Sequence, residues 1–306
     1  MKRILILSVA SLLSVVACGT QSSGSRSGGG TPSTIDSGNN GSSGQDQDST
    51  PPPPSKVNVT NETIQSGGTT RSYVLAVPKT YDDARAYPLV LVLHGDWGDG
   101  PGTRASYTFD DVTGDDAIVV YPTGNVYPGN AWVQSLDVDS YDMRFLRDLV
   151  DALKEKFTID PNRIFGVGYS SGGFMVNYVA CMIPMFRGIA SNEGGMASTD
   201  DGSPLACTAG PTATIIIHDP DDSAVDVSSG EWDAEYWAEQ ANCTDALDKH
   251  GNHLLPTTQV APPQCSAYNG CNPSYPVTLC LVPGIGHNWW WPEGATATWA
   301  FFQALP

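Results

Sequence analysis

A serine between two glycines is the residue of this sequence best suited to nucleophilic chemistry. Gly168-Tyr169-Ser170-Ser171-Gly172 fits the pattern Gly-x-Ser-x-Gly. Apolar residues 164–167 precede it as a strand would, and residues 174–178 follow with a helical composition. A strand, a glycine-flanked serine and a helix predict a sharp turn that exposes the Ser170 hydroxyl above a sheet, with the Ser171 amide aimed at a developing oxyanion. The alternative is an ordinary loop rich in Gly and Ser.

A serine nucleophile needs a base, and the chain contains five histidines. His287 follows the strand-like residues 277–282 and precedes the last helical segment. This is where a catalytic histidine lies when the order along the chain is serine, acid, histidine. We therefore expect His287 to accept the proton of Ser170.

The other four histidines have simpler interpretations. His94 ends an apolar segment before Gly95, and we expect it to shape the loop that follows. His218 also ends an apolar segment and is expected to order the aspartate-rich loop after it. His250 and His253 lie in a polar segment and are expected at the surface.

Three aspartates lie where the third catalytic group is expected. That group holds the imidazole in one tautomer and balances its charge in the transition state. The segment His218-Asp219-Pro220-Asp221-Asp222-Ser223-Ala224-Val225 lies between the serine and the histidine in chain order. The residues alone leave Asp219, Asp221 and Asp222 open as the acid.

A glycine-rich loop follows the apolar residues 89–93, with the sequence His94-Gly95-Asp96-Trp97-Gly98-Asp99-Gly100. Beside a nucleophilic serine, a loop in this place supplies the second oxyanion donor, here the backbone N–H of Asp96. A simple glycine-rich turn is the alternative.

The segments around these residues alternate between strand and helix patterns. Apolar runs typical of central strands in a parallel sheet occur at residues 73–77, 89–93, 117–121, 164–167 and 213–217. One helical stripe at three- and four-residue spacing comprises Phe145, Leu146, Leu149, Val150, Leu153 and Phe157. A turn is expected at Asp160-Pro161-Asn162. The alternation predicts an α/β domain with a mainly parallel central sheet and helices on both faces.

Composition limits the classes of partner. The chain has 306 residues, a formal net charge of -18 and 40% hydrophobic residues, enough for a sizeable core. Because so acidic a surface repels phosphate backbones, we expect no nucleic-acid partner. No residues have the spacing of a metal site, so we expect neither a metal nor a cofactor.

Residues 1–18 resemble a bacterial lipoprotein signal peptide. Lys2 and Arg3 precede the apolar residues 4–16, and Val15-Val16-Ala17-Cys18 resembles a lipobox whose cysteine carries the lipid. An ordinary signal peptide with a chance cysteine is the alternative. We expect an exported protein that is lipid-anchored to the bacterial outer membrane or cell surface, or secreted. Its only membrane contact would be the N-terminal lipid.

Residues 19–56 are rich in Ser, Gly and Pro and predict a disordered tether, which leaves residues 57–306 as the catalytic domain. Six cysteines follow Cys18, an even number that favours three disulfides in an exported protein over buried free thiols. They are Cys181, Cys207, Cys243, Cys265, Cys271 and Cys280.

A family resemblance rests on LVLVLHG, VDSYDMRFLRDLVDAL, DPNRIFGVGYSSGGFM, HDPDDSAV and GIGHNWWWP. These stretches, from about Thr70 to the C-terminus, resemble carbohydrate esterases of family 1, the feruloyl and acetylxylan esterases, and the related polyhydroxybutyrate depolymerases. The resemblance implies an α/β-hydrolase fold in one catalytic domain and a serine acyl-enzyme mechanism. Its acid loop usually reads His-Gly-x-x-Asp-x-x-Val, which selects Asp222 and places Asp219 at the usual glycine.

The resemblance also implies disulfide pairs and substrate contacts. It implies Cys181–Cys207, and we expect Cys243–Cys280 and Cys265–Cys271 for the remaining four. Trp97, Tyr169 and Trp289 are candidates for substrate binding. The run Trp289-Trp290-Trp291 is richer in tryptophan than the usual His-x-Trp-Pro, and its rings could stack on a phenolic acid or a sugar. Packing of the last helix against the core is the alternative for two of the three.

The function implied is hydrolysis of feruloyl or acetyl esters on plant cell-wall polysaccharide, or of a small ester, by a monomer. Alternatives are a polyhydroxyalkanoate depolymerase and a general small-ester esterase. An alternative of another class is a non-catalytic surface lipoprotein that binds glycan.

Overall fold

The computed structural model describes residues 55–124, 129–196, 207–243 and 257–306. The expected signal peptide, the expected tether up to residue 54, Cys18, His250 and His253 lie outside the described residues. Within the described ranges, no helix is both long and apolar enough to cross a bilayer.

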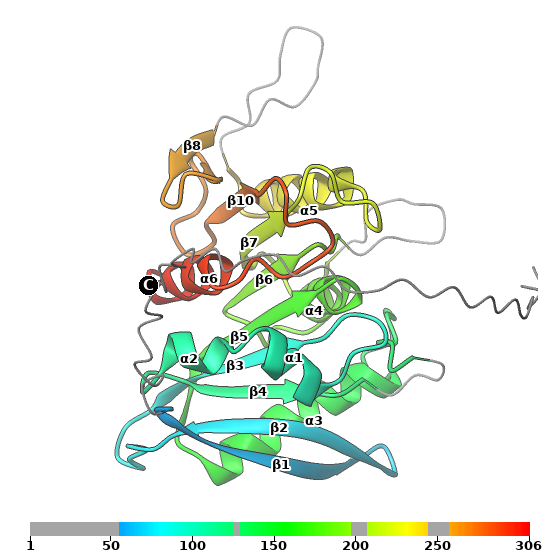
Figure 1. The fold of residues 1–306 in the computed structure, drawn as a ribbon, viewed down its shortest axis with the longest axis vertical. Coiled ribbons are helices and arrows are strands. Elements are labelled where there is room, and N and C mark those ends of the chain that lie inside the picture. The colour runs from blue at the N-terminus through cyan, green and yellow to red at the C-terminus, as the bar shows by residue number, and fades with distance from the viewer. Residues whose placement is uncertain (1–54, 125–128, 197–206, 244–256) are drawn as a thin grey trace, which may run out of the picture. The chain divides into compact units, whose positions relative to one another are not determined.

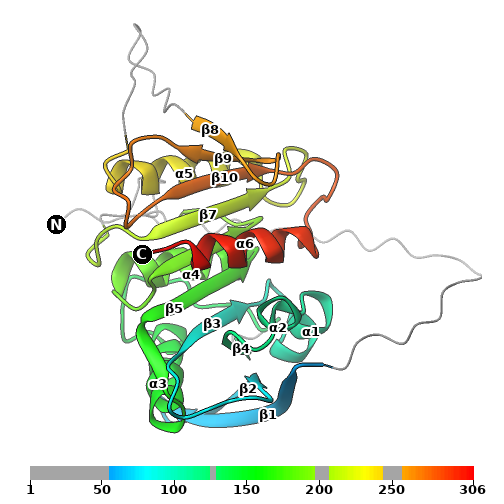
Figure 2. The same ribbon diagram turned by 90° about the vertical axis from the view of Figure 1, so that its left-hand side faces the viewer.

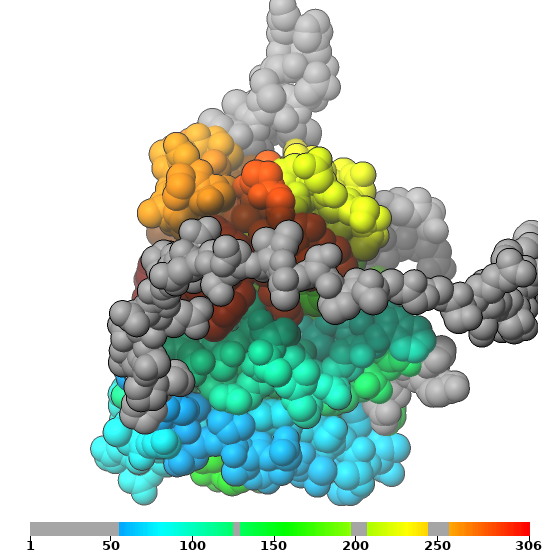
Figure 3. Space-filling view, in the orientation of Figure 1, coloured from blue at the N-terminus to red at the C-terminus, as the bar shows by residue number. Residues whose placement is uncertain are grey.

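One ten-stranded sheet forms the centre of the domain, in the order β1-β2-β4-β3-β5-β6-β7-β10-β9-β8 (Figure 1). The six strands from β4 to β10 in this order are parallel, whereas β1, β2, β9 and β8 add antiparallel pairs at the two edges. In the space-filling view, the region of β1 and β2 (blue to cyan) lies at one end of the domain and the region of β8 (orange) at the other (Figure 3). The strands are β1 Val57–Ser66, β2 Thr69–Pro78, β3 Tyr87–Leu93, β4 Ile118–Pro122, β5 Ile159–Tyr169, β6 Gly188–Asn192, β7 Ala213–His218, β8 Thr257–Val260, β9 Cys265–Tyr268 and β10 Val277–Leu281.

Helices cover both faces of this sheet (Figure 2). Helices α3, α4 and α5 pack on one face, and α1, α2 and α6 lie on the other. Their bounds are α1 Gly100–Ser106, α2 Phe109–Thr113, α3 Tyr141–Lys156, α4 Ser171–Met182, α5 Val227–Gln240 and α6 Glu293–Gln303. The predicted three-layer α/β fold is therefore confirmed.

The two hydrophobic cores explain why the central strands are apolar without interruption. Every residue of β3 is buried. Leu89 and Leu91 point into the core under α3, while Val90 and Val92 point into the core under α6. Because successive side chains of a strand point to opposite faces, a strand covered on both sides has no position for a polar residue.

The segment expected as a turn at residues 160–162 lies inside strand β5. Pairing with β3 advances only from Tyr87 to Leu89 while β5 advances from Ile159 to Ile164, so the extra residues form a bulge. The amide of Asn162 donates to the Asp160 carboxylate at 2.9 Å, which is a local turn within the strand.

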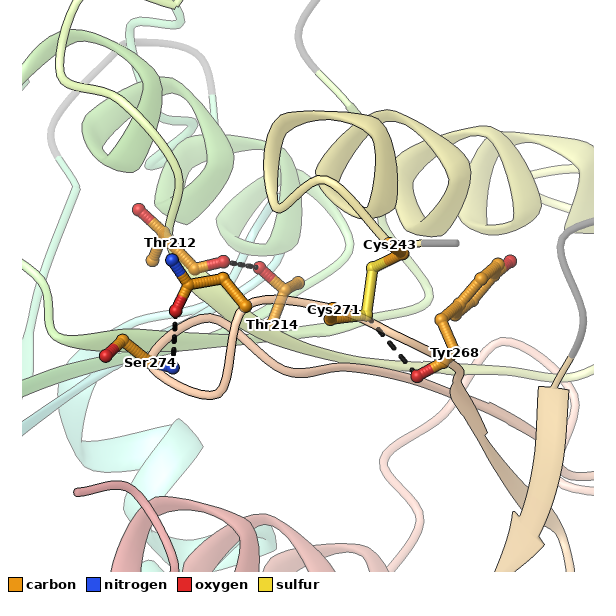
Figure 4. The surroundings of a disulfide bond; sticks show 7 residues. Thr212, Thr214, Cys243, Tyr268, Cys271 and Ser274 are labelled. Atoms are coloured by element: carbon orange, nitrogen blue, oxygen red, sulfur yellow. Dashed lines mark hydrogen bonds between the residues drawn. A yellow bond between two sulfur atoms is a disulfide. The ribbon is translucent and has the colours of Figure 1, made fainter. Parts of the chain in front are cut away.

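Two of the three expected disulfides are wrong. Cys181 pairs with Cys207, but Cys243 pairs with Cys271 and Cys265 with Cys280. The cause is the antiparallel register of β9 and β10, which places Cys265 directly opposite Cys280. Cys243 then joins the end of α5 to the loop after β9 (Figure 4). The Cys243–Cys271 and Cys265–Cys280 bonds therefore connect α5, the loop after β9 and the strands β9 and β10 near one edge of the sheet.

Candidate active site

Ser170 occupies a strained turn between β5 and α4. Its backbone has φ 52° and ψ -121°, a region that residues with a Cβ rarely adopt. The turn requires its flanking glycines: a Cβ on Gly168 would lie 2.0 Å from the Gly172 carbonyl oxygen, and one on Gly172 would lie 2.4 Å from the His94 carbonyl oxygen. The sequence motif therefore forms the sharp strand–serine–helix turn that it predicts.

His287 contacts the serine and one aspartate at the same time. Its Nε2 lies 2.9 Å from Ser170 Oγ, and its Nδ1 lies 2.7 Å from Asp222 Oδ2. Because the carboxylate accepts, Nδ1 carries a proton and Nε2 is left to accept the proton of the serine hydroxyl. The structure thus brings together the three residues expected as nucleophile, base and acid.

Asp222 is the aspartate of the loop that reaches the histidine. Its Oδ1 accepts from the amides of Ala224 (2.8 Å) and Val225 (3.2 Å). Burial raises the pKa of Asp222, but hydrogen bonds from His287 and these amides outweigh it and lower the pKa to about 2. The carboxylate is therefore charged at neutral pH.

The two competing aspartates lie elsewhere. Asp219 is buried, and its Oδ2 accepts from the Gly286 amide at 2.5 Å, in the turn that leads to His287. Burial raises the pKa of Asp219, but backbone amides that donate to the carboxylate lower it overall. Asp221 is exposed. Asp219 therefore holds the turn before His287 through the Gly286 amide and does not contact the imidazole of His287 in the described hydrogen bonds.

Tyr169 contacts the same loop. Its hydroxyl donates to the His287 carbonyl oxygen at 2.6 Å, and its ring lies 5.1 Å from the imidazole and 5.0 Å from the ring of Trp289. Tyr169 was expected to contact substrate; in the structure its hydroxyl is engaged with the backbone that carries the base.

The loop expected to supply the second oxyanion donor packs directly against the serine. A Cβ on Gly95 would lie 3.1 Å from the Cβ of Ser170, so this close approach needs glycine. His94 Nε2 accepts from the Gly124 amide at 2.8 Å, and Nδ1 donates to the Gly95 carbonyl oxygen at 2.6 Å. Burial lowers the pKa of His94, so the ring is neutral and structural, as its position predicted. Asp96 follows at the exposed tip of the loop.

A cavity of about 310 Å³ is lined by residues that adjoin the triad, although Ser170 and His287 themselves do not line it. Its lining includes Gly95, Asp96, Tyr169 and Trp289. Trp289 stacks on Tyr107 with ring centroids 3.9 Å apart, while Trp290 is buried in the core. The aromatic run after His287 therefore divides between the cavity wall and the packing of α6.

Trp97 projects into solvent from the glycine-rich loop. Its side chain is 76% exposed, its φ is 65°, and its amide donates to the Gly129 carbonyl oxygen at 2.6 Å. A large exposed aromatic ring held by its backbone next to a cavity is suited to stacking on a flat ligand.

A buried acidic residue that the sequence did not reveal lies close to Asp222 of the triad. Glu193 follows β6, and its side chain and those of His218 and Asp222 have no solvent exposure. His218 Nε2 contacts the Val225 carbonyl oxygen at 2.9 Å, so His218 orders the acid loop as expected. The three side chains place possible ligand atoms within 4.8 Å of one another. A lone glutamate after a five-residue strand has no motif that could have predicted this position.

Comparison with known proteins finds no matching protein-family model. Among curated proteins, the chain is 25% identical over 238 residues to feruloyl esterase B of Piromyces equi, covering 71% of this chain and 42% of that protein. It is 26% identical over 269 residues to feruloyl esterase C of Emericella nidulans, covering 80% and 88%. A poly(3-hydroxybutyrate) depolymerase of Ralstonia pickettii is 30% identical over 170 residues, covering 49% and 34%.

Solved structures agree on the fold. An acetyl xylan esterase from Aspergillus awamori superposes with a TM-score of 0.64 at 16% identity, covering 81% of this chain and 99% of that one. The feruloyl esterase module from Clostridium thermocellum, complexed with sinapinate, gives 0.62 at 14% identity, covering 83% and 90%. The predicted α/β-hydrolase fold is confirmed, and the predicted resemblance to feruloyl and acetylxylan esterases is confirmed as a similarity of sequence and fold.

Proposed function

We propose that the protein is an exported serine esterase that hydrolyses feruloyl or acetyl esters on plant cell-wall polysaccharide through a Ser170–His287–Asp222 triad. The observation that carries this proposal is the pair of contacts made by His287, at 2.9 Å to Ser170 Oγ and 2.7 Å to Asp222 Oδ2. A binding protein without catalysis would have no need for a strained serine in contact with a base.

The mechanism is acyl transfer in two steps. Ser170 Oγ attacks the ester carbonyl carbon while His287 Nε2 takes the hydroxyl proton, and Asp222 balances the charge of the imidazolium. Collapse of the tetrahedral intermediate breaks the bond to the alcohol, which leaves with the proton from His287. Water then attacks the acyl-enzyme by the same route, giving the carboxylic acid and free Ser170.

The backbone amides of Ser171 and Asp96 are proposed to hold the oxyanion. Ser171 is the first residue of α4, where amide groups and the helix dipole favour negative charge. Asp96 lies in the loop that packs against Ser170 through Gly95 and lines the adjacent cavity. A hydroxamate or fluorophosphonate bound to Ser170 would reveal both contacts in a crystal structure.

The choice of substrate rests on similarity to feruloyl esterases and on two aromatic side chains near the triad. The two relatives named above that match most of this chain are feruloyl esterases. Trp289 and the exposed Trp97 offer aromatic surfaces for a phenolic acid or a sugar ring. Polyhydroxyalkanoate is the second candidate, because the depolymerase of Ralstonia pickettii is 30% identical over 170 residues.

The proposed location of the protein is the cell surface. Three disulfides favour an oxidising compartment, and Cys18 in its lipobox-like context is proposed to carry a lipid that anchors a monomeric enzyme at the cell surface. Replacing Cys18 with serine should move the protein from the membrane fraction to the medium or periplasm.

The test is hydrolysis of methyl ferulate, p-nitrophenyl acetate and polyhydroxybutyrate by the purified protein, with Ser170→Ala as the control. Turnover of ferulate or acetate that disappears in Ser170→Ala supports the proposal and indicates the acyl group preferred. Activity on polyhydroxybutyrate alone would transfer the protein to the depolymerases. A folded protein inactive on all three esters would contradict the proposal.

A further inference from the structure

Glu193 directly follows β6. It lies at the carboxyl-terminal end of the parallel strands, as do Ser170 after β5 and the acid loop after β7. Its backbone has φ 47°, unfavourable for a residue with a Cβ. Its amide donates to the Ile217 carbonyl oxygen at 2.9 Å, so the residue is fixed to neighbouring strand β7. A glutamate held in this conformation with no solvent exposure needs a reason, because burying a carboxyl group is costly.

The surroundings of Glu193 are acidic. Both carboxyl oxygens accept from the Asp219 amide, at 3.0 and 3.2 Å. Its Oε2 lies 3.4 Å from His218 Nε2, and Asp222 Oδ2 lies 3.5 Å from the same nitrogen. The ionisable groups that act on Glu193 are the carboxylates of Asp219 and Asp222, the imidazole of His218 and the Tyr169 phenol from the end of β5. His287 contacts this cluster through Asp222, with its Nδ1 2.7 Å from Asp222 Oδ2.

His218 does not supply a compensating charge. A carbonyl oxygen only accepts, so the 2.9 Å contact between Nε2 and Val225 O requires a proton on Nε2. Nδ1 is buried without a hydrogen-bond partner in the described part of the chain, and a second proton there would be stranded. The same proton on Nε2 leaves no lone pair directed at the carboxylates, which argues against a metal ion between the three residues.

Two carboxylates buried side by side without a cation cannot both be ionised. We propose that Glu193 is a positioning residue: its protonated carboxyl group donates a hydrogen bond to Asp222, so that the pair holds one proton and one negative charge behind His287. This inference rests on the proposed triad. This second hydrogen bond would hold the Asp222 carboxylate in place for His287 while leaving its charge intact.

The protonation of the two acids agrees with this arrangement. Burial and the neighbouring Asp222 raise the pKa of Glu193 to about 9. For Asp222, the hydrogen bonds outweigh burial and bring the pKa to about 2. The proton therefore stays on Glu193 across neutral pH and leaves near pH 9, where repulsion between two carboxylates would displace Asp222 from His287.

The test compares Glu193→Gln, which keeps a donor at this position without a titrating proton, with Glu193→Leu, which removes the donor. Asp233→Asn is the matched control, since Asp233 is another fully buried acid with a raised pKa and its carboxylate accepts from Asn177, which is not a residue of the triad. For each full-length protein, kcat and KM for p-nitrophenyl acetate are measured from pH 6 to 10, with Ser170→Ala correcting for spontaneous hydrolysis.

We expect the wild type to lose kcat above about pH 9, and Glu193→Gln to keep kcat within roughly tenfold of wild type at pH 7 but without this alkaline decline. Glu193→Leu should lower kcat by roughly 10- to 100-fold with KM little changed, because orientation rather than binding is lost. Asp233→Asn should retain the alkaline decline. If Glu193→Gln loses as much kcat as Glu193→Leu, or keeps the decline, the inference is wrong.

Labelling of Ser170 by a fluorophosphonate provides a readout that does not depend on the natural ester. Its second-order rate constant should follow the same order among the variants and the same pH profile. A wild type that labels but hydrolyses no ester would contradict the proposed substrates and still test Glu193. Melting temperatures identify any variant that fails to fold; should Glu193→Leu do so, the pH profile of Glu193→Gln alone decides.

Discussion

Asp219 stands where the loop pattern implied by the family resemblance has glycine, and its contacts show what the aspartate side chain does in this protein. Its carboxylate accepts from the Gly286 amide at 2.5 Å, and its own amide donates to Glu193. The residue thus connects the turn before His287 to the buried acid behind the triad. The Asp219 side chain thus contacts the histidine loop without itself taking part in the triad.

Replacing Asp219 with asparagine should lower kcat by roughly 10- to 100-fold, because a small displacement of the base is costly when reacting atoms must be aligned. Asparagine has nearly the same size as aspartate but lacks its negative charge, which the backbone N–H groups of the turn stabilise. Steady-state kinetics on p-nitrophenyl acetate would measure this. Asp221→Asn, two residues away and exposed, is the control and should behave as wild type. Equal activity of both variants would contradict the role of Asp219.

Asp233 predicts how stability depends on pH. It is fully buried, and burial raises its pKa to about 7, although Asn177 donates to it at 2.7 Å. The folded state therefore keeps a proton that the unfolded state releases above its ordinary pKa near 4. The free energy of unfolding that this proton contributes is fully present below the unfolded-state pKa. It is lost as the pH rises toward 7, by an amount on the order of a few kcal/mol.

Asp233→Asn should remove this pH dependence, since asparagine resembles the protonated acid and does not ionise. Denaturant melts at pH 5 and pH 8 would show a smaller difference in unfolding free energy for the variant than for the wild type. An identical pH dependence in both proteins would mean that Asp233 does not hold its proton in the folded state.

At the scale of elements, the disulfides link the sheet edge to the base. Cys280 lies in β10, the strand that leads to the His287 loop, and Cys265 lies opposite it in β9. We expect Cys265→Ser with Cys280→Ser to lose about 2–4 kcal/mol of stability and to lower kcat more than loss of Cys181–Cys207 does. Mass spectrometry of unreduced peptides should find Cys243 with Cys271 and Cys265 with Cys280. Finding Cys243 with Cys280 would contradict the β9–β10 register.

What the sequence could and could not predict follows from the range of each interaction. The Ser170 turn is encoded by its own glycines, and the covered strands by continuous apolar residues, so both were predictable. The disulfide pairing depends on the register between β9 and β10, two short strands that carry no pattern strong enough to predict their pairing. Glu193 was not recognisable because its partners, His218 and Asp222, lie more than twenty residues away in the chain and reach it only through the β6–β7 pairing.

For the whole molecule, the dominant property is a net charge of -18. Such a charge should disfavour anionic substrates at low ionic strength and leave neutral ones unaffected. With two aryl esters that differ by one carboxylate on the acyl chain, added salt from about 10 to 200 mM should raise kcat/KM for the anionic ester by roughly two- to fivefold. A similar response of the neutral ester would show that salt acts on something other than charge repulsion.

Trapping the acyl-enzyme intermediate would show whether Ser170 is the nucleophile. The purified protein is mixed with p-nitrophenyl acetate, quenched in acid within the first turnover and digested for mass spectrometry. We expect an acetyl group on the peptide containing Ser170 and no acetylated peptide in Ser170→Ala. Acetylation of another residue, or steady hydrolysis by Ser170→Ala at the wild-type rate, would contradict it.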